Sequence, residues 1–193
     1  MSQPALKKYI TPEEYLAMEE AAEYRSEYYQ GEIFAMAGTT SNHNFIAGEV
    51  YTQMNLAFKG KDCVPYIIDV RLWIKAKGLF TYPDLMVVCG KTEFYENRKD
   101  TITNPVLIVE VLSDSTKDYD RGTKFMLYRS IPTLREYLII HQKQIHIEQF
   151  SLDEEGRWFL REYNDPNAIL RCASVDFQIP LREIYAKVEF ENK

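Results

Sequence analysis

The 193-residue sequence lacks long apolar runs. No stretch approaches the about 20 consecutive apolar residues of a membrane helix, and the N-terminal segment MSQPALKKYITPEEY has no apolar core like that of a signal peptide. With 46% hydrophobic and 27% charged residues, the composition is typical of a globular chain that buries a core. We therefore expect a cytoplasmic protein with no membrane partner.

Cysteine and glycine are also scarce. Cys63, Cys89 and Cys172 are far apart, odd in number and without CxxC spacing, so the sequence predicts reduced, buried thiols rather than a disulfide framework or a zinc site. The 8 glycines are not clustered, which excludes a glycine-rich phosphate loop. The segment VLSDST lacks a GxSxG elbow, which argues against a serine hydrolase.

Basic residues are outnumbered. The chain has 23 Lys plus Arg against 29 Asp plus Glu, a formal net charge of -6. Tight, sequence-blind binding to a polyanion needs clustered Lys and Arg, so this class of protein is disfavoured. The net charge is still compatible with an enzyme that contacts nucleic acid locally. Residues 117–135 form one of the few segments richer in basic than in acidic side chains.

Several elements can be predicted from local signals. Thr11, Pro12 and Glu14 have the spacing of a helix start with a capping box, which predicts an acidic helix over residues 11–25. Gln30 and Gly31 predict a turn into a strand, and apolar residues at helical spacing predict a helix over about 42–58. Further strands are expected in PYIIDVRLWIKA, TYPDLMVV, PVLIVEVLS, EYLIIH, QIHIEQF and RWFLREY, with a helix over 118–130.

This order of elements predicts one α/β (α+β) domain over residues 1–193, with a central mixed β-sheet flanked by helices. We divide it into the extra N-terminal acidic helix (about 11–25), a core (about 31–141), and a C-terminal β-hairpin and tail (about 142–193). A turn at 153–156 would close that hairpin.

Two acidic residues stand where buried strands should be apolar. Asp84 precedes the run LMVV, and Glu110 interrupts PVLIVEVLS. A buried carboxylate costs several kcal/mol unless it is paired or binds a cation. If the two strands are neighbours, the carboxylates would converge, and either a divalent cation or a basic side chain would be needed between them. Lys124, one helical turn before Tyr128, is a candidate; the alternative is a merely structural ion pair with Lys124 or Arg71.

Five ordered segments carry a resemblance to a known family. They are SEYYQGEIFAMAG, YPDLMVVCG, NPVLIVEVLSDST, YDRGTKFMLY and IPTLREYLII. Together they resemble the bacterial family of restriction-endonuclease-like proteins first described as a domain of unknown function, within the PD-(D/E)xK nuclease superfamily. The likeness extends from about residue 9 to 186.

The resemblance implies a restriction-endonuclease-like core and a metal-dependent nuclease site. Asp84 and Glu110 match the two acids that bind Mg²⁺ or Mn²⁺. The usual lysine position, two residues after the second acid, is Leu112 here, so Lys124 is the expected replacement. An additional acid before or in the first core helix is expected, with Glu32 the best match and Glu27 and Glu49 behind it.

Five other polar residues are weaker candidates or are expected at the surface. His43 could contact substrate or merely cap a helix, and Asp69 could form an internal ion pair with Arg71 that supports the site. Asp120 is four residues before Lys124 and would pair with it on a helix surface. His141 and His146 flank a predicted turn with no third ligand near them in sequence, so surface positions are expected.

The sequence thus predicts an endonuclease that uses Mg²⁺ or Mn²⁺ to hydrolyse phosphodiester bonds in DNA, acting as a homodimer because two antiparallel strands suit a two-fold axis. The alternative is a catalytically inactive nuclease-fold module that binds nucleic acid or a protein partner.

Overall fold

The computed structural model describes residues 9–36, 38–112 and 119–190, with the backbone alone for residues 119–121. The helices are α1 (Pro12–Ala21), α2 (Ser41–Ala57), a π-helical turn η1 (Tyr119–Lys124), α3 (Phe125–Tyr128) and α4 (Leu181–Ile184). The strands are β1 (Ser26–Tyr29), β2 (Glu32–Ala35), β3 (Cys63–Ile67), β4 (Arg71–Ile74), β5 (Leu79–Thr81), β6 (Leu85–Cys89), β7 (Thr101–Ile102), β8 (Leu107–Leu112), β9 (Glu136–His141), β10 (Ile147–Leu152), β11 (Trp158–Tyr163), β12 (Ile169–Arg171) and β13 (Gln178–Pro180).

A six-stranded mixed sheet forms the centre of the molecule. Its strand order is β11-β10-β9-β8-β6-β3, with β8 and β9 parallel and the other neighbours antiparallel. The inner strands β8 and β9 are almost entirely buried, as their continuous apolar sequences predict. The predicted α+β class with a central mixed sheet is confirmed.

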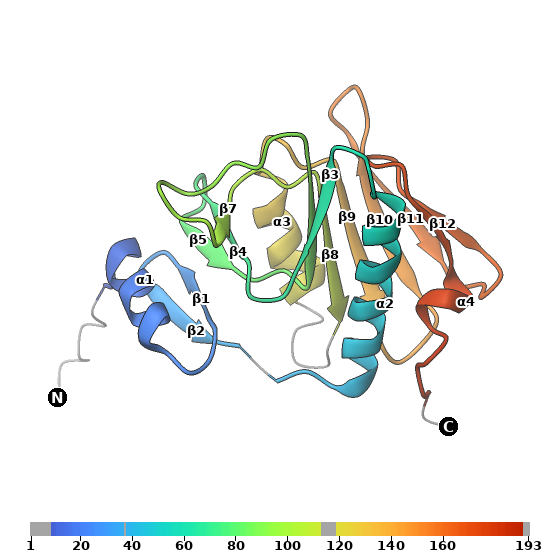
Figure 1. The fold of residues 1–193 in the computed structure, drawn as a ribbon, viewed down its shortest axis with the longest axis horizontal. Coiled ribbons are helices and arrows are strands. Elements are labelled where there is room, and N and C mark those ends of the chain that lie inside the picture. The colour runs from blue at the N-terminus through green and yellow to red at the C-terminus, as the bar shows by residue number, and fades with distance from the viewer. Residues whose placement is uncertain (1–8, 37, 113–118, 191–193) are drawn as a thin grey trace, which may run out of the picture.

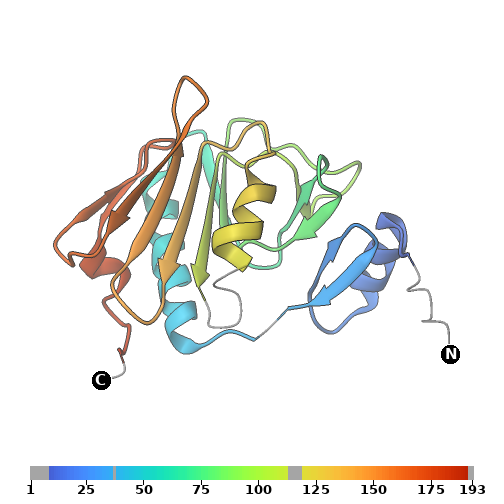
Figure 2. The same ribbon diagram turned by 180° about the vertical axis from the view of Figure 1, so that it is seen from behind.

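Helices cover the two faces of this sheet. On one face, Ile46, Val50 and Met54 of α2 pack against Val109 and Val111 of β8, as seen with α2 in front of the sheet in Figure 1. On the other face, α3 packs over the sheet, and the view from behind places α3 in front (Figure 2). The core is therefore two apolar layers separated by the strands, and residues alternate between them along each strand.

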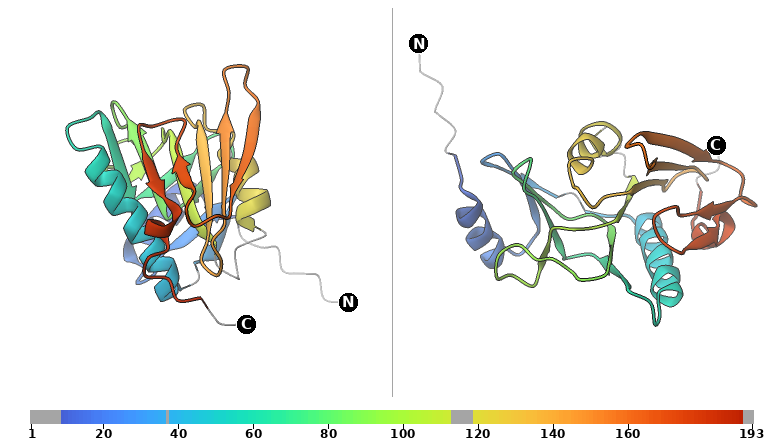
Figure 3. Two further views of the ribbon diagram at one scale, coloured as in Figure 1. Left: turned by 90° about the vertical axis from the view of Figure 1, so that its right-hand side faces the viewer. Right: turned by 90° about the horizontal axis from the view of Figure 1, so that it is seen from above.

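A second, five-stranded sheet carries the N-terminal part of the chain, with strand order β2-β1-β5-β4-β7. Helix α1 packs here through Tyr15 and Leu16 onto Tyr28 and Phe80, in a small aromatic core of its own. Seen from above, in the right-hand view of Figure 3, this N-terminal unit lies to one side of the central sheet. Its strand β1 brings an acidic side chain toward the central sheet, as described below.

The N-terminal prediction is only partly right. Thr11 and Glu14 form the predicted capping box, but the helix ends at Ala21 instead of continuing to residue 25. Ala22 has extended φ and ψ angles, and Ser26–Tyr29 forms β1, which pairs with β2 across the turn at Gln30 and Gly31. The strand forms because Tyr28 packs in the aromatic core with α1 and Tyr29 packs against the apolar layer under α3. Helix propensity does not describe such tertiary contacts.

Later elements agree better with their predictions. Helix α2 and the hairpin β10–β11 occur as expected, but that hairpin extends the central sheet and a further ribbon, β12–β13, follows it. The predicted helix over 118–130 is described as η1 and α3, and residues 113–118 lie outside the described residues. No helix in the described ranges combines the length and the apolar character needed to cross a bilayer.

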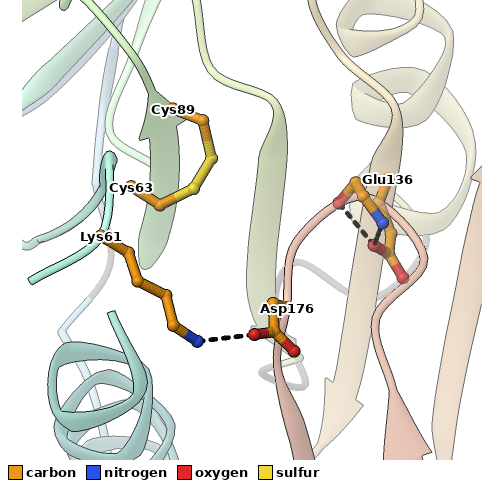
Figure 4. Close-up of a disulfide and its surroundings, with 6 residues drawn as sticks. Lys61, Cys63, Cys89, Glu136 and Asp176 are labelled. Atoms are coloured by element: carbon orange, nitrogen blue, oxygen red, sulfur yellow. Dashed lines mark hydrogen bonds and ion pairs between the residues drawn. A yellow bond between two sulfur atoms is a disulfide. The ribbon is translucent and has the colours of Figure 1, made fainter. Parts of the chain in front are cut away.

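The cysteine prediction is wrong for two of the three residues. Cys63 and Cys89 are direct partners in the β3–β6 ladder and form a disulfide at the edge of the central sheet (Figure 4). Only the register of the two strands brings them together, since 26 residues separate them in sequence. Cys172 remains a free thiol, and burial raises its pKa.

The disulfide should stabilise the protein by restricting the unfolded chain. For a loop of this length, removing it through the Cys63→Ser/Cys89→Ser double substitution should lower the free energy of unfolding by about 3 kcal/mol, measured by urea denaturation without reductant. Dithiothreitol should lower the wild-type stability by a similar amount and leave the double variant unchanged. Equal wild-type unfolding curves with and without reductant would contradict this expectation.

Candidate active site

Glu110 is the fourth residue of β8, in the middle of the central sheet. Its side chain is 4% exposed and lies on the α3 face, which it shares with Ile108 and Leu112. Strands β6 and β8 pair with Leu85 opposite Val109, so continuing this register by one residue places Asp84 opposite Glu110. The predicted adjacency of the two acid-bearing strands is thereby confirmed.

Lys124 supplies positive charge to this carboxylate. Its Nζ lies 3.1 Å from Oε1 of Glu110, and its side chain is 8% exposed. The Tyr128 hydroxyl, one turn further along α3, donates to the same Glu110 oxygen at 2.6 Å. The helical segment after β8 therefore packs over this strand. It supplies the basic side chain near Glu110 that the apolar Leu112 cannot provide.

A third carboxylate joins the group from the second sheet. Glu27 of β1 lies with its Oε1 3.5 Å from Lys124 Nζ, and its side chain is 12% exposed. Strand β1 pairs with β5, which brings Thr81 beside Glu27, and the Thr81 hydroxyl donates to the Glu27 carboxylate. Lys124 thus lies between two carboxylates that come from different sheets.

Asp84 is held by two donors. Its Oδ2 accepts a hydrogen bond from the backbone N–H of Val111 at 2.7 Å and lies 3.1 Å from Nε2 of His43. His43 is in the first turn of α2, whose start is capped by the Thr40 hydroxyl bonding to the His43 N–H. The helix start therefore fixes an imidazole against Asp84, and His43 does more than cap its helix.

The chain leading into Asp84 is anchored by a buried polar network. The Tyr82 hydroxyl accepts from Nε of Arg71 at 2.8 Å and donates to Glu19 at 3.0 Å. Burial raises the pKa of Tyr82, against the opposing effect of Arg71, so the phenol stays protonated and able to donate. This network ties α1, β4 and the segment before β6 together and positions Asp84.

Some predicted site residues lie elsewhere or have other partners. Asp69 is in the bend between β3 and β4 and pairs with Arg25 at 3.1 Å, so the predicted internal pair with Arg71 is wrong. Arg71 points instead to Tyr82 and Thr101. The side chain of Asp120 lies outside the described residues.

The additional acid that contacts Lys124 is Glu27, which ranked behind Glu32 in the prediction. Glu32 begins β2 opposite Tyr29, on the same side of the β1–β2 ribbon as Glu27. The pairing of β1 with its neighbouring strands, and not the spacing along the chain, determines that Glu27 reaches Lys124. Alternation in SEYY could have indicated Glu27, but only if β1 had been recognised as a strand.

The donor chemistry of this group fits a hard divalent cation. Asp84 and Glu110 offer carboxylate oxygens, which Mg²⁺ and Mn²⁺ prefer, whereas Glu27 pairs with Lys124 and the three acids do not all lie within 4.8 Å of one another. Asp84 and Glu110 are the residues that would hold such an ion. Glu110 is also compensated by Lys124 and Tyr128, which is the arrangement expected of a structural ion pair.

The fold is that of the restriction-endonuclease-like class. A solved structure from Anabaena variabilis ATCC 29413, described as "a putative nuclease belonging to DUF820", superposes with a TM-score of 0.76. The match covers 92% of this chain and 98% of that chain, at 16% sequence identity.

The chain belongs to the family Uma2, described as "Putative restriction endonuclease", whose family model matches residues 12–182. Two uncharacterized proteins of Synechocystis sp. (strain ATCC 27184 / PCC 6803 / Kazusa) are similar to it. Protein sll1609 is 38% identical over 164 residues, covering 85% of this chain and 93% of the relative. Protein slr1290 is 34% identical over 183 residues, covering 94% of each.

Lys124 should be required for stability because its removal leaves Glu110 and Glu27 without their shared cation. We expect Lys124→Met to lower the free energy of unfolding by about 3 kcal/mol in urea denaturation. A double-mutant cycle with Glu110→Gln should show a coupling free energy of about 1–3 kcal/mol. Lys187→Met, at an exposed position, is the control and should change stability little. Additive effects in the cycle would contradict the pairing.

Proposed function

We propose that the protein is a divalent-metal-dependent endonuclease that hydrolyses phosphodiester bonds in DNA. The observation that carries this proposal is the position of the Lys124 ammonium, 3.1 Å from the Glu110 carboxylate. Glu110 is on β8, and the register of the neighbouring strand β6 places Asp84 opposite it. Two acids on adjacent central strands and a lysine beside them are the parts that the superfamily resemblance implies. Membership of a family described as restriction endonucleases supports the same activity.

Each residue has a defined part in the proposed reaction. A bound Mg²⁺ or Mn²⁺, held by Asp84 and Glu110, would stabilise charge on the scissile phosphate and lower the pKa of a bound water. The Lys124 ammonium would donate to a phosphate oxygen or orient the attacking water. His43 and the Val111 N–H hold Asp84 in place, and Tyr128 holds Glu110, so both acids are positioned before substrate arrives.

A cleavage assay tests this proposal. The purified protein is incubated with supercoiled plasmid, single-stranded DNA and RNA, with Mg²⁺ or Mn²⁺ or with a chelator. Wild type should cut DNA only with a divalent cation. Asp84→Asn, Glu110→Gln and Lys124→Met should each lower the rate by about 100-fold or more, because each removes transition-state charge stabilisation.

Two exposed positions provide matched controls. Glu154→Gln and Lys187→Met remove the same charges far from the site and should cleave at the wild-type rate. Circular dichroism at the assay temperature checks that each variant is folded. Equal cleavage by wild type and the three site variants would refute the nuclease proposal and favour an inactive nuclease-fold module. Cleavage of RNA alone would overturn the choice of DNA.

We also propose a homodimer as the form that cuts both DNA strands, because a two-fold axis relates two sites to antiparallel strands. Sedimentation analysis of the wild-type protein should give twice the monomer mass. A monomer that converts supercoiled plasmid directly to the linear form would contradict this proposal.

A further inference from the structure

A second group of metal-binding side chains lies where β9 turns into β10. His141 ends β9, and its N–H bonds to the carbonyl of His146 at 3.0 Å across the turn. The two imidazole rings meet edge to face with their centroids 4.6 Å apart. Their side chains are 14% and 15% exposed, so the predicted surface positions of both histidines are wrong.

Two glutamates complete this group, which we call the hairpin cluster (His141, His146, Glu148 and Glu162). Oε1 of Glu148 lies 3.4 Å from Nε2 of His141 and 3.6 Å from Nε2 of His146, and its side chain is 9% exposed. Oε1 of Glu162 lies 3.4 Å from Nε2 of His146, and its side chain is 55% exposed. Three ligands are thus nearly buried, and the fourth faces solvent.

The separations within the hairpin cluster match those between ligands of one metal ion, although the His141–Glu148 contact is also a long hydrogen bond. N–H···O bonds are usually 2.7–3.2 Å long, shorter than all three separations. Ligand atoms at about 2.0–2.2 Å from a tetrahedral ion are about 3.3–3.6 Å from one another, which matches the values found. The ligand atoms of His141, His146 and Glu148 all lie within 4.8 Å of one another, and they form the one group of three or more such ligands found among the described residues.

The pairing of the strands gives a separate reason for a cation. Glu148 and Glu162 are direct partners in the β10–β11 ladder, and like charges at such positions destabilise a sheet. A divalent ion between them would remove the repulsion. Because imidazole is a good ligand for zinc and similar transition metals but not for Mg²⁺, the donor set also indicates which class of ion would bind.

We propose that the hairpin cluster binds a zinc-class transition-metal ion through His141, His146 and Glu148. The exposed Glu162 contacts only His146 in the pairs given above, and a rotation of its side chain would bring its carboxylate into the fourth position. This ion joins the ends of β9, β10 and β11. Glu110 of β8 and Glu148 of β10 are both partners of Ile139 on β9, so one intervening strand separates the hairpin cluster from the candidate active site. The proposal therefore does not depend on nuclease activity.

Titration of the full chain with zinc chloride tests the site. After dialysis against a chelator, calorimetry should show one zinc ion bound per chain, with no competition from millimolar Mg²⁺. Asp84→Asn should retain this binding, whereas His146→Gln and Glu148→Gln should weaken it about 100-fold or more, and the exposed Glu162→Gln by about 10-fold. Glu155→Gln, in the turn that joins the opposite ends of β10 and β11, is the matched control and should bind as wild type.

Cobalt provides a readout that does not depend on affinity. Co²⁺ bound by the wild type should show the intense visible absorption of a tetrahedral site, and His146→Gln should lose it while remaining folded by circular dichroism. If His146→Gln fails to fold, the exposed Glu162→Gln decides, through an altered cobalt spectrum. The proposal is overturned if the wild type binds no zinc, or if Asp84→Asn abolishes binding and His146→Gln does not.

Discussion

The burial of the Glu110 carboxylate in the central sheet is the constraint on which the site depends. A charge in that position must be compensated, because desolvation of an unpaired carboxylate costs several kcal/mol. The protein meets this need with Lys124 and Tyr128 from the segment after β8, at 3.1 and 2.6 Å. Since Lys124 also contacts Glu27, the same lysine joins the N-terminal sheet to the central one.

Burial of an acid does not by itself indicate catalysis, as Glu136 shows. This residue, labelled in Figure 4, is fully buried at the start of β9. It accepts hydrogen bonds from the N–H groups of Ala173 and Ser174. Neutral donors satisfy it, so its role is to hold the loop between β12 and β13. Glu110 differs because its partners include an ammonium group that also contacts a second carboxylate.

Local signals in the sequence predicted the elements that depend on local physics. The capping box of α1, the apolar periodicity of α2 and the apolar run of β8 each specify their structure within a few residues. The sequence could not predict contacts that depend on strand register. The pairing of Cys63 with Cys89 and the approach of Glu27 to Lys124 both follow from which strands are neighbours.

The distinction between local signals and strand register also explains which site residues could be predicted. Asp84 and Glu110 were identifiable because a charge at an apolar strand is anomalous wherever its neighbours lie. Lys124 was identifiable from its place in the following helix and from the family resemblance. His141 and His146 gave no such signal, since their ligand-type neighbours become close only when β10 pairs with β9 and β11. A period of two residues between His146 and Glu148 was the one local indication that they share a face.

The apolar residue at position 112 connects the two sites. In the parallel β8–β9 ladder Leu112 is the direct partner of His141, so a lysine at 112 would place an ammonium group next to the hairpin cluster. Such a charge would repel a cation bound there. With the lysine at position 124 instead, the positive charge remains beside Glu110, and Leu112 packs in the apolar layer beneath α3. A lysine at position 124 instead of 112 thus keeps the basic group of the candidate active site away from the proposed cation ligands of the hairpin cluster.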